Sequence, residues 1–510
     1  MGSNSLFQGR VQFFLALVVW ILVGYVFNIL IGRSIWVDEG MLLKNIADAK
    51  GLLSYFDPLP FYDQAQPMFA SFIQYLFFHN VSMDIEILRI YTLAVSFLIS
   101  FPVLYVFYKE KTGFLLPSVI FLAFSLSLGF YVTEIKHYAF EIAASFLMIA
   151  IFYLQTKEKL SFQVSIILIA MTTYIGFSTI IPAFFIISYL TVFNFLRSGK
   201  YFFEIKTILA LLISLSIALI TLSHMNNLTV YQISNFDAYD SKGLWGDLVN
   251  LIAIGVSSHG KALTLSVSLM VILLLFFNKK YFVFKLNIVF LLIVSFVCFG
   301  KLTGFYPVFS ARHIIWIVPF SFVILVIGIS HFVKSKDIVF KAVGLFALAL
   351  SVLQSVNVVY KSASGISSES TENNQLYEEL AQLKSADVMV YPHAKPTLEF
   401  YLKTIERLNK HNYIGFHDNV YVSSLKNPET SKERFFERID SNFKSIPSEE
   451  FYYVISHLDY SLPDQDLPKS QSWRRDYLNA KLSDYNCSHS ETYSGRRVSI
   501  LRVFCRGMIE

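Results

Sequence analysis

The stretch VQFFLALVVWILVGYVFNILI, residues 11–31, runs directly into GRSIWVDEG, residues 32–40. The first part is long enough to cross a membrane, because a transmembrane helix needs about 20 apolar residues. No small-residue cleavage pattern follows it, so we expect a retained first span and not a signal peptide. The second part places two adjacent carboxylates, Asp38 and Glu39, close to the membrane surface. We therefore expect a helical membrane protein with acidic residues at one surface.

The composition agrees with this expectation. Of the 510 residues, 55% are hydrophobic and 15% are charged, and the mean hydropathy is +0.52. A soluble globular chain carries about 25% charged residues. The net charge of +5 is spread in short clusters at the ends of apolar runs. No long basic stripe exists, which argues against nucleic-acid binding.

The apolar runs predict an α-helical polytopic membrane protein with about eleven transmembrane helices. The expected spans are 11–31, 88–108, 113–131, 138–155, 161–177, 179–196, 206–223, 261–278, 284–304, 313–333 and 338–358.

Every second loop between these spans is basic, which is the pattern of cytoplasmic loops. Arg10 places the N-terminus on the same side, and an odd number of spans then places the C-terminus outside. The residue usage suggests a bacterial chain, so the expected location is the plasma (inner) membrane with a periplasmic or extracellular C-terminal part. The basic pairs are Lys109 and Lys111, Lys157 and Lys159, Arg197 and Lys200, Lys279 and Lys280, and Lys334 and Lys336.

Two domains are expected. Residues 1–360 form the transmembrane domain, with outer loops at about 32–87 and 224–261. Residues 361–510 follow a Ser-rich linker. The expected strands there are Asp387 to Tyr391, Val420 to Ser423, Phe451 to Ser456 and Val498 to Phe504, and the expected helices are Lys395 to Lys403, Lys432 to Phe443 and Ser472 to Leu482. This alternation predicts an α/β domain outside the membrane. An outer location would permit a disulfide between Cys487 and Cys505, although pairing cannot be read from sequence.

Ionisable residues gather at the outer ends of the spans, where charge is costly unless it is solvated, paired or used. Asp38 is the candidate general base, with Glu39 beside it. Glu134, in the outer turn 131–139, is a second acid that could assist the first or hold a divalent ion. Any one of these could also be an ordinary interface residue.

Four cations are candidates for binding a phosphate: Arg312, Lys301, Arg89 and Lys136. Arg and Lys stabilise a phosphate leaving group as its bond breaks. Each could instead be a topological anchor at the membrane surface. The sequence contains no Cys/His metal spacing, no nucleophile elbow and no phosphate-binding Gly loop, so no other chemistry competes well.

The ordered set of short motifs resembles the GT-C superfamily of integral-membrane glycosyltransferases. The nearest branch resembles the protein O-mannosyltransferases and the lipid A aminoarabinose transferase. The resembling segments are Trp36 to Gly40, Gln64 to Phe69, Leu88 to Tyr91, Thr133 to Tyr138, Ala311 to Ile314, Val390 to Pro392, Leu398 to Leu402 and Tyr453 to His457.

The resemblance implies transfer of a sugar from a polyprenyl phosphate to an acceptor hydroxyl with inversion, on the outer face of the membrane. Asp38 matches the essential first-loop acid of the family, and Glu134 matches its second acidic position. Lys136 stands where Arg is common, which leaves donor and acceptor identity open. The acceptor could be lipid A, another cell-envelope glycan or a protein. We expect a substrate pocket that includes His137, Tyr138, Gln66 and His313, with no required cofactor and a divalent cation optional.

Three other functions fit parts of the pattern. A lipid-linked oligosaccharide ligase or polymerase would use the same phosphate clamp. A flippase would carry charge in mid-span or broken helices, and the spans here lack central charge. A scaffold would act through the C-terminal domain alone. Replacement of Asp38 separates a transferase from a flippase or a scaffold, because the latter two should tolerate the change.

Overall fold

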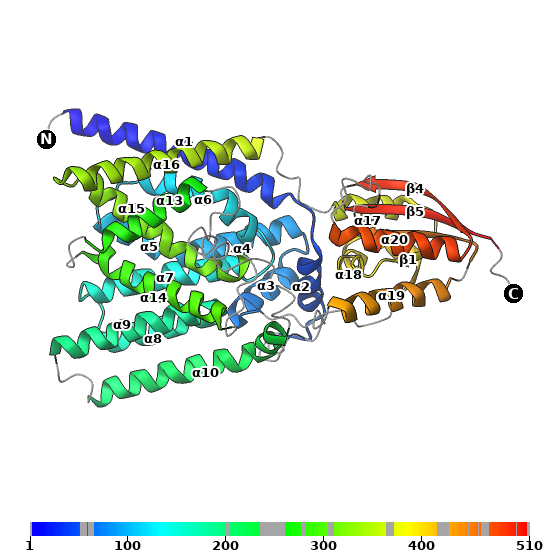
Figure 1. Ribbon diagram of the computed structural model, residues 1–510, viewed down its shortest axis with the longest axis horizontal. Coiled ribbons are helices and arrows are strands. Elements are labelled where there is room, and N and C mark those ends of the chain that lie inside the picture. Colours follow the sequence, from blue (N-terminus) through cyan, green and yellow to red (C-terminus); the bar gives the residue numbers. More distant parts are fainter. Residues whose placement is uncertain are drawn as a thin grey trace.

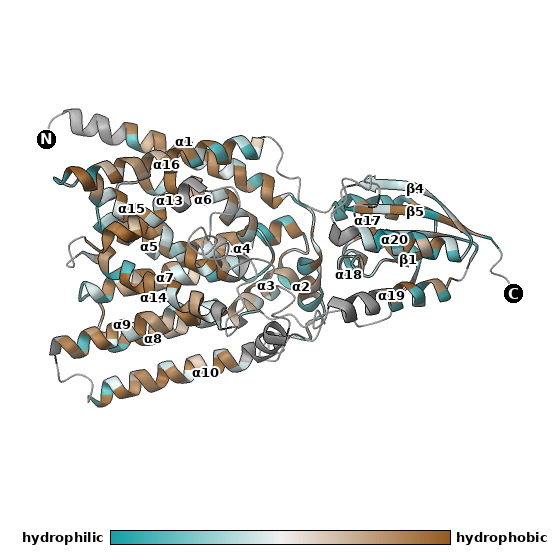
Figure 2. Ribbon diagram, in the orientation of Figure 1, coloured by the Kyte–Doolittle hydropathy of each residue, from teal (hydrophilic) through white to brown (hydrophobic). Residues whose placement is uncertain are grey.

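The computed structural model of the chain is elongated, with a helical bundle at one end and a smaller sheet domain at the other (Figure 1). Apolar residues dominate the bundle helices, whereas the sheet domain mixes polar and apolar residues (Figure 2). The structure describes residues 3–51, 59, 66–198, 204–234, 261–276, 281–303, 311–363, 372–415, 428–446, 448–456, 458, 460, 469–495 and 497–506.

The bundle is built from long helices and short 3-10 turns. The α-helices are α1 (Ser3–Ile31), α4 (Ile85–Ser100), α5 (Pro102–Lys109), α6 (Leu115–Val132), α7 (Tyr138–Thr156), α8 (Phe162–Met171), α9 (Ile180–Ser198), α10 (Ile205–Ser234), α13 (Lys261–Leu274), α14 (Phe282–Leu302), α15 (Val318–Val333) and α16 (Ile338–Ala363). The 3-10 turns are η2 (Thr172–Tyr174), η3 (Phe177–Thr179) and η5 (Ala311–Ile317).

Seven helices in the described part of the chain are long and apolar enough to cross a membrane, and the bent pair α4–α5 adds an eighth. Three shorter apolar helices, Leu115–Leu126, Phe162–Tyr174 and Leu265–Leu274, lie in three more of the expected spans. The chain is therefore an integral membrane protein. The number of eleven spans stays a prediction, as does the side of the membrane on which each end lies.

Two features of the sequence explain the shape of the bundle. Pro102 lacks an N–H and follows Phe101, where α4 and α5 meet at 43°. Helix α15 is apolar on all sides, and its buried residues, including Phe320 and Phe322, form the centre of the bundle core together with Trp316 of η5. A helix that is apolar all round belongs inside a bundle.

The sheet domain is a five-stranded mixed sheet in the order β2-β1-β3-β5-β4. Strand β1 pairs in parallel with β2 and β3, and β5 pairs antiparallel with β3 and β4. This α/β architecture was expected, but β2, β4 and α17 were missed, and the strand expected at Val420 to Ser423 lies outside the described residues. The elements are α17 (Asn373–Gln382), β1 (Asp387–Val390), α18 (Lys395–Thr404), η7 (Glu406–Lys410), β2 (Asn412–Ile414), α19 (Pro428–Lys444), β3 (Glu450–Ser456), α20 (Lys469–Asp484), β4 (Cys487–Gly495) and β5 (Val498–Cys505).

Two short helices join the bundle to the sheet domain. They are α2 (Val37–Ala47) and α3 (Met68–Asn80), which lie between the two parts in Figure 1. Their buried apolar residues, such as Leu43, belong to the same hydrophobic core as the sheet domain. Helix α18 packs on α2 so closely that a Cβ on Gly40 would come 2.9 Å from the Thr397 backbone nitrogen. The sheet domain thus supports α2 directly.

Candidate active site

Asp38 lies in the first turn of α2, immediately after the first membrane helix. Trp36 precedes the helix in an extended conformation, and Asp38 and Glu39 are the acidic residues of its first turn. Negative charge is stabilised at this end of a helix by the unpaired backbone N–H groups and the helix dipole. The Asp38 side chain remains 22% exposed. It is therefore held in place and open to solvent.

Lys136 faces Asp38 from the turn between α6 and α7. Its Nζ donates to Asp38 Oδ2 at 3.1 Å. The ammonium group also lies 5.7 Å from the Trp36 ring centroid and 6.0 Å from that of Tyr138, at distances typical of cation–π contacts. A carboxylate and an ammonium group thus lie side by side, next to the rings of Trp36 and Tyr138.

Glu39 points away from Asp38 into the protein interior, where it pairs with Arg89. Its Oε2 lies 2.7 Å from Arg89 Nη2, and both side chains are fully buried. Its Oε1 accepts from Arg89 Nε at 3.3 Å and from the Ile135 N–H at 2.9 Å. Burial acts to raise the pKa of Glu39, but the charges of Arg89 and Arg33 outweigh it and hold the pKa below its usual value.

All five N–H donors of Arg89 form hydrogen bonds within the protein. Besides the two contacts with Glu39, its Nη1 donates to the carbonyls of Ile31 and Arg33, and its Nη2 donates to that of Ser34. These bonds fix the path of the chain from α1 to α2. The predicted role of Arg89 in binding a phosphate stays a prediction.

Glu134, the second candidate acid, is buried beside Arg33. Glu134 Oε1 lies 3.6 Å from Arg33 Nη2, and the Arg33 guanidinium lies 4.3 Å from the Phe130 ring centroid. Burial lowers the pKa of Arg33, although Glu39 and Glu134 oppose that shift. The sequence prediction missed Arg33. A cation directly after the first span, on the side otherwise poor in basic residues, was the signal that could have found it.

His137 ends the same turn and Tyr138 begins α7, and their predicted contact with substrate stays a prediction. Their ring centroids are 4.9 Å apart, and His137 Nε2 lies 3.6 Å from Glu141 Oε1. Glu141 is buried and accepts from the Ser178 backbone N–H at 3.3 Å. Glu141 was not among the predicted site residues, since the first turn of a membrane helix is also a common place for a structural acid.

Gln66 lies apart from this cluster in a buried polar network. Its Nε2 donates to Gln74 Oε1 at 2.7 Å, and its Oε1 accepts from Ser71 Oγ at 3.2 Å. Gln74 continues the network to Thr92 Oγ1 at 3.5 Å. These bonds join α3 to α4, so Gln66 is engaged in packing and its predicted contact with substrate stays a prediction.

Three further candidates have described backbones but side chains outside the described part of the chain. Lys301 lies near the end of α14, and Arg312 and His313 lie at the start of η5. Because η5 packs against α7, the backbone of Arg312 belongs to the same region of the bundle as the Glu134 turn. Their roles in binding phosphate and substrate stay predictions.

Within the described residues, no three His, Cys, Asp or Glu side chains gather as metal ligands. The involvement of a divalent cation, and a reaction that requires no cofactor, both stay predictions. In the sheet domain, Cys487 and Cys505 are joined in a disulfide that ties the start of β4 to the end of β5. Cys298 is a free thiol in α14.

The comparisons with known proteins define the class of fold. The sequence matches no protein-family model, and it matches no curated protein sequence. The structure, in contrast, matches solved structures over nearly its whole length, at low sequence identity.

Two of these solved structures are of ArnT from Cupriavidus metallidurans. The apo form superimposes with a TM-score of 0.54 at 12% identity, covering 98% of both chains. The form bound to undecaprenyl phosphate gives a TM-score of 0.53 at 11% identity and the same coverage. The present chain therefore has the fold of ArnT from the first helix to the sheet domain.

Proposed function

We propose that the chain is a glycosyltransferase that moves a sugar from a polyprenyl-phosphate donor to an acceptor hydroxyl, on the outer face of the membrane. The observation that carries the proposal is the contrast among its three clustered acids. Glu39 and Glu134 are buried in ion pairs with arginines, whereas Asp38 is partly exposed and lies 3.1 Å from Lys136. One carboxylate is thus available for chemistry while its neighbours hold it in position.

In the proposed reaction, Asp38 accepts the proton of the acceptor hydroxyl. The hydroxyl oxygen forms a bond to the anomeric carbon as the bond from that carbon to the carrier phosphate breaks. The bonding electrons leave with the phosphate, whose negative charge a nearby cation stabilises. Lys136 is the described cation best placed for this role, and Arg312 is the second candidate. A single displacement of this kind inverts the anomeric configuration.

An apolar cavity in the bundle supports a lipid-linked donor. The cavity has a volume of about 540 Å³ and is lined by residues of α1, α4, α5, α6, α7 and α15. It extends from Lys111 at one end of the bundle to Val132 and Ala139, which flank the turn that carries Glu134 and Lys136. An apolar cavity that extends between these residues suits a prenyl chain, with its phosphate close to Lys136.

The fold adds a second line of support. One of the ArnT structures with the same fold is bound to undecaprenyl phosphate, which is a polyprenyl phosphate. We extend that ligand class to this chain on the strength of the cavity and the Asp38–Lys136 pair. The proposed orientation follows the basic loops: the N-terminus is cytoplasmic and the sheet domain is periplasmic or extracellular.

The test is a transfer assay with radiolabelled polyprenyl-phosphate sugars, hexoses and pentoses, in vesicles of known orientation. The proposal predicts that one donor is consumed and that carrier phosphate is released in equal amount to sugar transferred. Movement of an intact donor across the vesicle membrane without consumption would contradict the proposal and favour a flippase. Transfer of a preassembled oligosaccharide alone would favour a ligase.

A further inference from the structure

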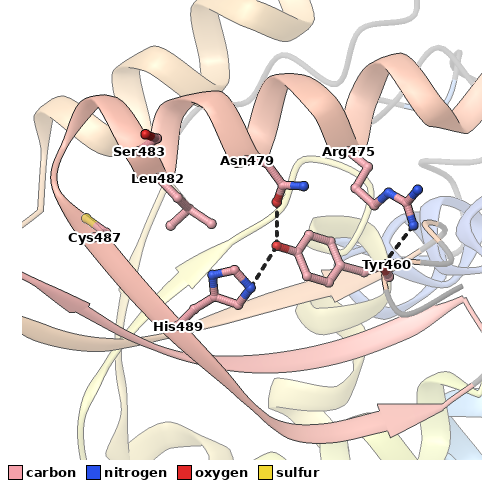
Figure 3. Close-up of a pocket in the computed structure, with 7 residues that line it drawn as sticks. All are labelled: Tyr460, Arg475, Asn479, Leu482, Ser483, Cys487 and His489. Atoms are coloured by element: carbon pink, nitrogen blue, oxygen red, sulfur yellow. Dashed lines mark hydrogen bonds between the residues drawn. The ribbon is translucent and has the colours of Figure 1, made fainter. Parts of the chain in front are cut away.

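A second pocket lies in the sheet domain, between α20 and β4. Its volume is about 470 Å³, within the range of roughly 300–1,000 Å³ that small-molecule sites occupy. In Figure 3, side chains from α20 point toward Tyr460 and His489 across the pocket. Helix α18, and not α20 or β4, packs on α2. The pocket is lined by Tyr460, Arg475, Asn479, Leu482, Ser483, Cys487 and His489.

Three of these residues form a hydrogen-bonded row (Figure 3). The Tyr460 hydroxyl donates to Asn479 Oδ1 at 2.6 Å, and its oxygen lies 3.1 Å from His489 Nε2. Because a tyrosine hydroxyl has one hydrogen, His489 Nε2 must be the donor in the second bond. The polar groups of this row that remain are the amide N–H groups of Asn479 and the Nδ1 atom of His489, and neither makes a further hydrogen bond within the described part of the protein.

The pocket is held rigid on both sides. Arg475 is buried in α20 with 6% exposure, and its Nη1 donates to the Tyr460 carbonyl at 3.3 Å. On the other side, the disulfide between Cys487 and Cys505 fixes β4 two residues before His489. A site whose polar groups are already fixed loses little entropy when a ligand binds.

The available groups favour a neutral ligand with several hydroxyls. Asn479 offers donors, His489 offers a ring nitrogen, and the half-buried Tyr460 ring offers an apolar surface. A sugar hydroxyl both donates and accepts, so it matches such a mixture of groups. The charges nearest Tyr460 have both signs, Arg475 and Glu491, and therefore give no net preference for an anion.

We propose that this pocket binds one or two neutral sugar residues of a glycan, at a site separate from Asp38. The choice of a glycan as ligand rests in part on the proposed transferase function. Bound there, a glycan would be retained by the sheet domain while another part of it, or of its carrier, reaches the active site. The pocket would thereby raise the local concentration of a glycan acceptor.

The test measures binding of neutral trisaccharides to the full-length protein in detergent, by saturation-transfer NMR. The probes are maltotriose, mannotriose and chitotriose, and inorganic phosphate serves as the anionic probe. We expect at least one trisaccharide to bind and Asn479→Ala or His489→Ala to weaken it about five-fold or more, because each removes a hydrogen bond worth roughly 1 kcal/mol. Both side chains are exposed, so the variants should fold.

Ser490→Ala is the matched control, since Ser490 is exposed on the same strand and alternates to its other face. The inference is overturned if no trisaccharide binds, if phosphate binds instead, or if Asn479→Ala binds as the unaltered protein does. Asp38→Asn separates this inference from the transferase proposal. That variant should lose transfer and keep trisaccharide binding, whereas transfer that survives it would contradict the proposed function alone.

Discussion

Asp38 and Glu39 are adjacent in the chain, yet the helix that carries them sends the two carboxylates into different surroundings. Asp38 meets solvent and Lys136, whereas Glu39 is enclosed by Arg89 and the Ile135 N–H. Two unlike environments for two carboxylates are a common way to assign them separate tasks. In our account Asp38 does the chemistry, and Glu39 with Arg89 determines where Asp38 lies.

Replacing Glu39 should therefore reduce stability more than it alters substrate binding. Glu39→Gln leaves the Arg89 charge buried without its partner, a change that costs on the order of 3–5 kcal/mol. We expect a large fall in the thermal unfolding midpoint in detergent. Glu86→Gln, on the exposed side of α4, is the control and should change stability by less than about 0.5 kcal/mol. A Glu39→Gln protein that is fully stable but inactive would contradict a positioning role.

The Glu39–Arg89 pair should also make the stability of the protein depend on pH in the acid range. Because the folded pKa of Glu39 is lowered, its contribution to stability is present above the ordinary glutamate pKa of about 4.3 and is lost as the pH falls through the folded value. The difference in unfolding midpoint between the unaltered protein and Glu39→Gln should thus shrink as the pH falls below about 4. A difference that stays constant down to acid unfolding would show that Glu39 does not titrate there.

At the scale of elements, α2, the helix that follows the first membrane span, is contacted on two sides. The turn between α6 and α7 contacts α2 through Lys136 and Ile135, and α18 of the sheet domain packs on its other side at Gly40. Asn373 adds a hydrogen bond from its Nδ2 to the Ile35 carbonyl at 2.6 Å. Helix α2, which carries the proposed base, is therefore positioned by segments that lie far apart in the sequence.

Gly40→Ala should loosen this contact. Alanine favours a helix over glycine by about 1 kcal/mol, so any loss must come from the new Cβ, which would lie 2.9 Å from the Thr397 nitrogen. We expect faster amide hydrogen exchange in α18 and reduced transfer. Gly32→Ala is the control, because its Cβ would meet nothing closer than 3.8 Å. Unchanged exchange in α18 would show that the sheet domain does not support α2.

The sequence indicated the polar residues at this end of the bundle, but not how they pair. Local apolar runs and the basic loops indicated where the helices begin. The turn with Glu134 and Lys136 was named, together with Asp38, as a candidate part of the site. The partners of Glu39 and Glu134 could not be predicted, because Arg89 lies 50 residues from Glu39 and such pairing depends on how helices cross. Strand β4 was missed for a local reason, since its exposed polar side chains lack the apolar alternation of a half-buried strand.

At the scale of the whole molecule, an apolar cavity and the polar cluster around Asp38 meet at one end of the bundle. The cavity reaches Val132 and Ala139 on either side of the turn that carries Glu134 and Lys136. The sheet domain closes the opposite side of α2 and carries its own polar pocket. In our proposals, the cavity takes the lipid carrier, the surroundings of Asp38 carry out the reaction, and the pocket of the sheet domain binds a glycan.

Filling the cavity should weaken binding of the donor. Ser96 of α4 lines the cavity, and Ser96→Phe would occupy part of its volume of about 540 Å³. We expect the donor KM to rise several-fold with kcat little changed, because the lost contacts involve the chain and not the reacting atoms. Leu98→Phe, at an exposed position of the same helix, is the control. An unchanged KM would place the prenyl chain elsewhere.

The most direct test of the account is single-turnover transfer by Asp38→Asn compared with Asp84→Asn, in protein shown to be folded and inserted. Asp84 is an exposed acid that caps α4 through the Ile87 N–H, and asparagine can keep that cap. The account predicts a loss of at least about 100-fold in the transfer rate for Asp38→Asn, as expected when a general base is removed, and a normal rate for Asp84→Asn. Equal rates in the two variants would contradict the assignment of Asp38 as the base.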